Sequence, residues 1–236
     1  MSKEQTITFI SEGYQLVGSL NLPDRLPAPM VIGCHGLLAN RHSPKQIALG
    51  RTCCEHGIGY LRFDHRGCGE SPGDLAHSAS LNARCDDLAS AIAALAANPS
   101  CGSLLGLFGS SFGGTVVLSY SAANPVTHLV TYAAPITSHG LGSAGVSAKL
   151  DPGHKAIIEH QWDFDIRPSL SALANILIIH AENDAIVPVA HAHEIHCRAK
   201  HPKKLWIQNK GDHPMSDPIL QTGFLSQALN WYQKGL

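Results

Sequence analysis

The residues Gly109-Ser110-Ser111-Phe112-Gly113 form a Gly-x-Ser-x-Gly motif, which can present a serine hydroxyl for nucleophilic attack. The apolar run 104–108 before it predicts a buried strand, and the small apolar run 114–123 after it predicts a helix that ends before a proline. Glycines two positions either side of Ser111 fit a sharp turn in which a Cβ would collide with the strand or the helix. The plainer alternative is an ordinary strand-to-helix turn with Ser110 as its cap.

A serine hydroxyl needs a base to take its proton and an acid to orient that base. Two later strands, at residues 176–181 and 204–207, are each followed by such residues. The first strand leads to Glu182 and Asp184, and the second leads to His213. Asp184 is preferred to Glu182 as the acid because of its place in the loop, and Asp212 is expected to be solvated at the surface. The chain order Ser, Asp, His is that of a known triad arrangement.

The elements that must position these groups alternate along the chain. An antiparallel hairpin is predicted over residues 6–20. Strands are predicted at residues 30–34, 58–63, 104–108, 126–134, 176–180 and 204–207, and helices at 44–56, 81–97, 114–123, 189–200 and 218–232. This alternation predicts a mainly parallel sheet of about eight strands, wound with helices on both faces. In such sheets the ligand binds at the carboxyl ends of the strands, where the candidate residues fall.

The composition excludes several classes of protein. The 236 residues carry a net charge of −1 and are 44% hydrophobic, which suits one domain with a sizeable core and gives no basic surplus for nucleic acid. No signal peptide or bilayer-spanning run is evident, so a cytoplasmic protein without a membrane partner is expected. Seven cysteines without a CxxC pair are expected to be reduced and buried. A homodimer stays open as an assembly state.

Five segments in order resemble the α/β-hydrolase superfamily over nearly the whole chain. They are His35-Gly36, the run from Asp64 to Ser71 with its Asp-x-Arg-Gly-x-Gly-x-Ser pattern, the motif at Ser111, Asp184 and His213. Within the superfamily the sequence is similar to small bacterial serine hydrolases grouped with feruloyl esterases, monoacylglycerol lipases and serine aminopeptidase-like proteins. The resemblance implies a single α/β-hydrolase domain over residues 1–236.

The resemblance also implies a role for each matching residue. Ser111 would be the nucleophile, His213 the general base and then acid, and Asp184 the group that holds the imidazole tautomer. The oxyanion hole would use the backbone amides of Leu37 and Phe112. No metal or organic cofactor would be required.

The segment 135–174 lies where the superfamily inserts a cap, and its periodicity fades there. Its apolar side chains either line an acyl or aryl pocket or only pack the cap onto the domain; they are Leu141, Ile157, Trp162 and Phe164. A cap this short suggests a compact substrate.

Other polar clusters have structural interpretations beside functional ones. Asp64 and Arg66 are expected to form a salt bridge within their loop, His35 to orient the oxyanion loop, and Asp217 to cap the last helix. The histidines of segment 191–196 include a pair three residues apart, which metal ligands can use, but a polar helix face is the preferred interpretation.

The sequence therefore predicts a serine hydrolase, a carboxylesterase that acts on small acyl or aryl esters through an acyl-enzyme. One alternative is a peptidase or amidase of the same fold, which would need acidic residues such as Asp163 or Asp165 to bind an amine. Another is a non-catalytic binding protein of this fold. A nucleotide-binding protein is set aside because no Gly-x-x-x-x-Gly-Lys-Ser/Thr loop is present.

Overall fold

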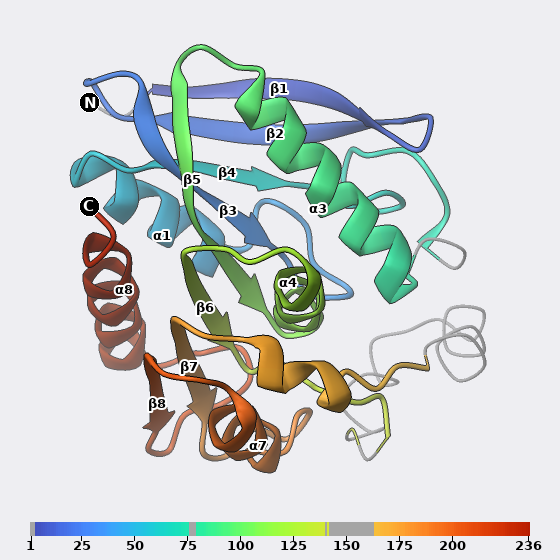
Figure 1. The fold of residues 1–236 in the computed structure, drawn as a ribbon, viewed down its shortest axis with the longest axis vertical. Helices are drawn as coiled ribbons and strands as arrows, with labels where there is room; N and C mark the ends of the chain where they lie inside the picture. The colour runs from blue at the N-terminus through green and yellow to red at the C-terminus, as the bar shows by residue number, and fades with distance from the viewer. Residues whose placement is uncertain (1–2, 76–78, 140, 142–162) are drawn as a thin grey trace.

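The structure, a computed structural model, describes residues 3–75, 79–139, 141 and 163–236. These residues form one eight-stranded sheet in the order β1-β2-β4-β3-β5-β6-β7-β8 (Figure 1). The strands are β1 (Lys3–Ser11), β2 (Tyr14–Leu22), β3 (Ala28–Cys34), β4 (Gly59–Phe63), β5 (Cys101–Ser110), β6 (His128–Tyr132), β7 (Ile176–Ala181) and β8 (Lys203–Gln208). Strands β3 to β8 pair in parallel, whereas β1 and β2 pair antiparallel.

The direction of each strand follows from its sequence. The hairpin β1–β2 turns at Glu12 and Gly13, both at positive φ, and β2 then pairs antiparallel with β4. Strand β3 is buried except at Pro29, and β4, β6 and β7 are buried along their whole length, as expected for strands covered on both faces. The predicted mainly parallel, doubly wound sheet is confirmed.

Helices cover both faces of the sheet, as Figure 1 shows. The helices are α1 (Pro44–Glu55), α3 (Leu81–Ala96), α4 (Phe112–Ala123), α7 (Ala190–Arg198) and α8 (Pro218–Gln233), with a 3₁₀ helix η1 (Arg167–Ala172). One apolar core includes residues of α3, α4 and α7, and a second includes residues of α1 and α8. Two separate cores bury both faces and hold the strand ends in fixed positions.

The predicted cap segment 135–174 lies mostly outside the described residues, including Ile157 and Trp162. Its two ends are described and they meet. Thr137 and Asp165 form an isolated antiparallel bridge, and the Ser138 backbone N–H donates to the Phe164 carbonyl over 2.9 Å. The segment therefore leaves and rejoins the domain at neighbouring points.

The seven cysteines are all free in the structure, and their reduced state stays a prediction. Cys34, Cys53, Cys54 and Cys68 are buried, while Cys197 is exposed. The prediction that the cysteines are buried is therefore confirmed only in part. Of the helices within the described ranges, none has the length and apolar character needed to cross a bilayer.

Candidate active site

Ser111 lies at the turn between β5 and α4 with φ 54° and ψ −128°, a conformation that costs free energy for a residue with a side chain. The flanking glycines make this turn sterically feasible. A Cβ on Gly109 would lie 2.3 Å from the Gly113 carbonyl oxygen, and one on Gly113 would lie 2.2 Å from the Cys34 carbonyl oxygen. The predicted collision with the crossing strand and helix is confirmed. The Ser111 N–H donates to the Tyr132 carbonyl over 2.8 Å and so fixes the turn to β6.

Three side chains from three strand ends form a chain of hydrogen bonds. His213 Nε2 lies 3.1 Å from Ser111 Oγ, and His213 Nδ1 lies 2.7 Å from Asp184 Oδ2. An ionised carboxylate can only accept, so Nδ1 carries the proton of the neutral ring. The lone pair of Nε2 then faces the serine hydroxyl, which donates to it. The structure thus brings together the three residues that the sequence singled out.

Asp184, not Glu182, is the carboxylate that contacts His213. Burial raises the pKa of Asp184, but the His213 hydrogen bond and the N–H groups of Val187 and Ile186 lower it below its ordinary value overall. Asp184 is therefore a fixed anion beneath the imidazole. Glu182 instead accepts a hydrogen bond from the Lys210 backbone N–H over 3.0 Å.

The loop after β3 lies against the serine. A Cβ on Gly36 would lie 3.3 Å from Ser111 Cβ, so this glycine permits the close approach. His35 accepts a hydrogen bond at Nε2 from the His65 N–H, over 3.2 Å, which leaves the proton on Nδ1 to be donated to the Gly36 carbonyl over 2.7 Å. Burial and the nearby charges of His65 and Arg84 hold the pKa of His35 well below its usual range. His35 orients this loop, as predicted.

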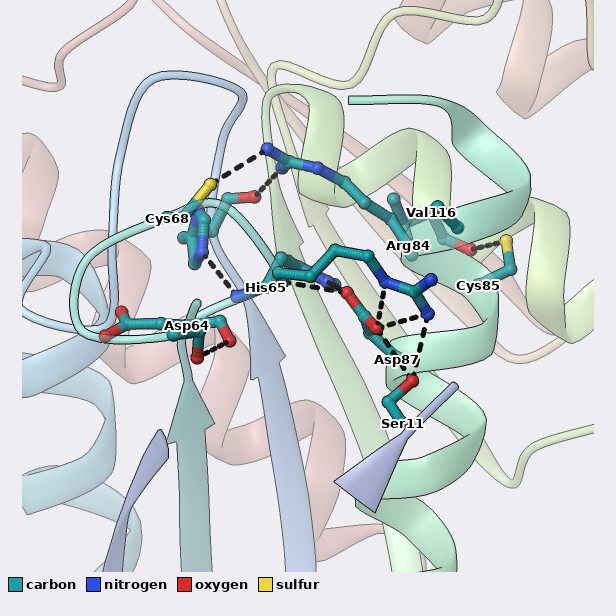
Figure 2. A network of polar contacts seen from close by, with 12 residues as sticks. Ser11, Asp64, His65, Cys68, Arg84, Cys85, Asp87 and Val116 are labelled. Atoms are coloured by element: carbon teal, nitrogen blue, oxygen red, sulfur yellow. Dashed lines mark hydrogen bonds and ion pairs between the residues drawn. The ribbon is translucent and has the colours of Figure 1, made fainter. Parts of the chain in front are cut away.

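Arg84 of α3 fixes the same loop from the other side. Its guanidinium donates to the carbonyl oxygens of Leu37 over 3.0 Å, of Gly36 over 3.4 Å and of His35 over 3.5 Å. It also lies 5.2 Å from the ring centroid of Phe112, the first residue of α4. The Arg84 side chain is fully buried, and Figure 2 shows it extending from α3 towards Cys68 and the loop.

A second buried network lies beside Arg84 and is centred on Asp87 (Figure 2). Asp87 accepts hydrogen bonds from the Ser11 hydroxyl, the Arg66 guanidinium and the His65 ring, over 2.8, 2.8 and 3.3 Å. These contacts connect β1, the loop after β4 and α3. Burial raises the pKa of Asp87, but its partners lower it far below the usual range, so the group is ionised.

The predicted salt bridge between Asp64 and Arg66 is wrong. Asp64 pairs with Arg41, which donates to it through both its guanidinium and its backbone N–H, and Arg66 pairs with Asp87. The reason is the course of the loop, which curls around the Asp64 carboxylate. A Cβ on Gly69 would lie only 2.3 Å from Asp64 Oδ2, and the Glu70 N–H donates to the same oxygen.

A cavity of about 280 Å³ opens beside Ser111 and His213. Leu141 lines it together with Leu37, Leu38, Ile186 and Val187, so of the cap residues chosen from the sequence Leu141 reaches the cavity. Phe164 is buried and packs on the Phe112 ring with centroids 5.4 Å apart. The cap residues were expected either to line a pocket or to pack the cap onto the domain, and Phe164 packs onto the domain.

One of the α7 histidines has a structural role. His191 accepts a hydrogen bond at Nδ1 from the Ile136 N–H over 3.0 Å, which ties α7 to the start of the cap segment. Across the part of the chain that the structure describes, no three His, Cys, Asp or Glu side chains gather as a metal site would require.

Asp217 caps α8 through the Ile219 N–H over 2.7 Å, as predicted, and Asp212 accepts from the Ser216 N–H over 2.8 Å instead of only facing solvent.

Two residues of this region were missed from the sequence, Arg84 and Lys45. The signal for Arg84 was available, because Arg84, Asp87, Leu88, Ala91 and Leu95 form the buried stripe of α3 and two of them are charged. Lys45 lines the cavity from the first turn of α1, where a single lysine gives no sequence signal.

The strand order, the serine at the β5–α4 turn and the groups after β7 and β8 define an α/β hydrolase. An esterase from Pyrococcus furiosus has the same fold, with a TM-score of 0.83 at 18% identity over 99% of this chain and 91% of that chain. Residues 26–151, more than half of the chain, match the family of hydrolases described as serine aminopeptidase, S33, and the chain belongs to this family.

Two curated proteins are also similar in sequence. The uncharacterized protein YfhR of Escherichia coli strain K12 is 26% identical over 163 residues, which cover 67% of this chain and 54% of YfhR. The mitochondrial palmitoyl-protein thioesterase ABHD10 of Rattus norvegicus is 33% identical over 97 residues, 41% of this chain and 31% of that protein. The matches thus span about half or less of the length of these relatives.

Proposed function

We propose that this α/β hydrolase is a carboxylesterase that works through a Ser111–His213–Asp184 triad and an acyl-enzyme. The observation that carries the proposal is the hydrogen-bond chain from Ser111 Oγ through the His213 ring to Asp184. In this mechanism His213 Nε2 takes the serine proton as Oγ attacks the ester carbonyl carbon, and it then protonates the departing alcohol. Asp184 keeps the ring in the required tautomer and stabilises the imidazolium. Water then attacks the acyl-enzyme by the reverse sequence of proton transfers.

The oxyanion hole is proposed to use the N–H groups of Leu37 and Phe112. In a trans peptide the C=O and the N–H point in opposite directions. The Gly36 carbonyl accepts hydrogen bonds from Arg84 and from the His35 ring, and it therefore points towards α3. The Leu37 N–H belongs to the same peptide and points the opposite way, which supports an orientation towards Ser111. The Phe112 N–H belongs to the first turn of α4, where N–H groups point beyond the helix end and favour negative charge.

A small ester fits the cavity better than a peptide N-terminus does. Its volume of about 280 Å³ is at the lower end for ligand sites, and its lining is mostly apolar. An aminopeptidase would need an anion for the substrate amine. Asp165 is paired with Arg167 and Asp163 accepts from the Ser138 hydroxyl, and neither lines the cavity in the described part of the chain. The seven free thiols support a reducing compartment, such as the cytoplasm, as the place of this activity.

The test is labelling with a fluorophosphonate, with the adduct mapped by peptide mass spectrometry, together with hydrolysis of p-nitrophenyl esters of increasing acyl length. We expect the adduct on Ser111 and the highest turnover for short acyl chains. Ser111→Ala should remove labelling and turnover while the circular dichroism spectrum stays the same. Ser110→Ala is the matched control, because it removes the neighbouring hydroxyl, whereas the serine that is hydrogen-bonded to His213 in the described part of the chain is Ser111.

Labelling elsewhere, or turnover retained in a folded Ser111→Ala protein, would contradict the assignment. A folded wild-type protein that neither labels nor hydrolyses any ester would favour the alternative of a non-catalytic binding protein of the same fold.

A further inference from the structure

The cavity beside Ser111 contains one lysine and no carboxylate within the described lining. Lys45 of α1 lines it, and the remaining lining residues are apolar or neutral apart from the histidine of the triad. Lys45 also borders a second cavity of about 160 Å³ between α1 and α8, whose other lining residues carry no charge. Among their described lining residues, the two spaces on either side of Lys45 offer its ammonium group no acidic side chain.

The neighbours of the ammonium leave donor capacity unused. Lys45 Nζ donates to the Pro214 carbonyl over 2.9 Å and lies 5.0 Å from the centroid of the Tyr132 ring. An ammonium carries three donors, and within the described residues this carbonyl is its one hydrogen-bond acceptor. Pro214 directly follows His213, so the charge is held at the side of the catalytic imidazole.

The two carboxylates whose charges act on Lys45, Asp212 and Asp184, already accept hydrogen bonds from other groups. Asp184 is bonded to His213, Ile186 and Val187, and Asp212 accepts from the Ser216 N–H. Burial lowers the pKa of Lys45 to about 8, although the charges of Asp212 and Asp184 act in the opposite direction. The charged ammonium of Lys45 is therefore destabilised by its loss of hydration, and an anionic ligand would provide it with a counter-ion.

We propose that Lys45 binds an anionic group of the substrate, so that the enzyme prefers esters that carry a carboxylate. This inference rests on the proposed esterase function and adds the class of its substrate. The Lys45 ammonium donates a charge-assisted hydrogen bond to the substrate carboxylate, in the same cavity that the apolar side chains Leu141 and Ile186 line. With its carboxylate bound to Lys45, the substrate then presents its ester group to Ser111.

The experiment compares kcat/KM for two pairs of esters. Monoethyl succinate and ethyl pentanoate differ in a carboxylate on the acyl part, and 4-acetoxybenzoate and 4-methylphenyl acetate differ in a carboxylate on the alcohol part. For at least one pair we expect the anionic ester to be preferred by about tenfold, the scale of one charge-assisted hydrogen bond. Lys45→Met should reduce the ratio to about one, through KM more than kcat, and Lys45→Arg should retain most of it.

Lys210→Met is the matched control, because it removes the same charge from the exposed turn after β8 and does not line either cavity. The pH dependence is a further test. The groups that face Lys45 are Asp212, Asp184, Tyr132 and His213, and with the Lys45 pKa near 8 the preference for the anionic ester should fall as the pH rises through that value. The Lys45→Met ratio should not change with pH in this range.

An equal fall in kcat/KM for the anionic and the neutral ester in Lys45→Met would overturn the proposal. It would mean that Lys45 only positions the His213 loop through Pro214. A wild-type ratio near one in both pairs would overturn it as well. Calorimetric titration of monoethyl succinate into the Ser111→Ala protein separates this inference from the proposed function. Binding there that Lys45→Met removes supports the anion site even if no ester is hydrolysed.

Discussion

The identity of the acid in the proposed triad is decided at the scale of single residues, and Asp184→Asn tests it. An amide at position 184 can donate to His213 Nδ1, which would shift the ring proton to Nε2 and leave Ser111 without a base. We expect turnover of a p-nitrophenyl ester to fall by about 10⁴-fold, as tautomer loss does in other triads. Glu182→Gln is the control and should leave the rate nearly unchanged. The opposite pattern in these two variants would identify Glu182 as the acid.

We expect Arg84 to act as a positioning residue for the loop that carries the proposed oxyanion hole, because its hydrogen bonds to this loop go to three backbone carbonyls. Arg84→Lys keeps the charge but loses the planar fork, so it cannot bind three carbonyls together. We expect kcat to fall by about 10- to 100-fold with little change in KM, since misplaced oxyanion donors weaken only the transition state.

Cys85→Ala on the same helix is the control for Arg84→Lys, because the Cys85 thiol contacts the Val116 carbonyl and not the oxyanion loop. Thermal midpoints of both variants should be measured. If the apparent kcat fell only in proportion to the loss of folded protein, so that kcat per folded molecule was unchanged, Arg84 would serve stability alone.

The pairing of Asp64 shows what single-residue reasoning from the sequence lacks. Asp64 and Arg66 are two positions apart, and a local salt bridge was the simplest expectation. The structure pairs each with a residue more than 20 positions away, Arg41 and Asp87. Partners of buried charges are set by which strand ends meet, and the local sequence does not contain that information. By contrast, Ser111, Asp184 and His213 could be found because the strand ends that carry them are recognisable.

At the scale of elements, the turn between β5 and α4 depends on how closely α4 approaches the end of β3. In Gly113→Ala the new methyl group would lie within 2.6 Å of the Cys34 and His35 carbonyl oxygens, which are backbone atoms. Helix α4 and β3 must then separate, and this moves Leu37 and Phe112 apart. We expect a stability loss of about 1–3 kcal/mol and a larger loss of turnover, measured by chemical denaturation and ester hydrolysis.

Gly223→Ala in α8 is the matched control for Gly113→Ala. The added methyl there would lie 2.8 Å from the edge of the Trp206 ring, and neither Gly223 nor Trp206 belongs to the described lining of the cavity beside Ser111. It should lower stability without a specific effect on kcat. If Gly113→Ala lost no more turnover than Gly223→Ala, the spacing of α4 and β3 would not control the site.

Elements were more predictable than their contacts. The alternation of apolar runs with helical segments gave the strands and the two-sided cover, because period and burial are local properties of a sequence. The order of the strands in the sheet and the packing of Phe164 on Phe112 depend on contacts between distant segments. Local patterns do not encode such contacts, so the cap residues stayed an open choice.

At the scale of the whole molecule, the buried neutral histidines make stability depend on pH. Burial lowers the pKa of His65 to about 4, and it lowers the pKa values of His35, His180 and His191 as well. A folded-state pKa below the unfolded value of 6.5 means that the unfolded chain binds protons first as the pH falls. Stability is therefore fully present above about pH 6.5 and declines as the pH falls from there towards 4. For His65 alone, the pKa shift from 6.5 to about 4 corresponds to a decrease of roughly 3 kcal/mol in the free energy of unfolding.

The carboxylates extend this acid sensitivity to lower pH. The pKa values of Asp87 and Asp184 are lowered in the folded protein, so their contribution is present above the ordinary value of 3.8 and is lost as the pH falls below it. We expect urea midpoints to decrease continuously from pH 6.5 to 3. In His65→Gln the slope between pH 6.5 and 4 should become shallower even though the variant is less stable at neutral pH. An unchanged slope would show that His65 takes up no proton on unfolding, and that the Asp87 network holds its ring charged in the folded state.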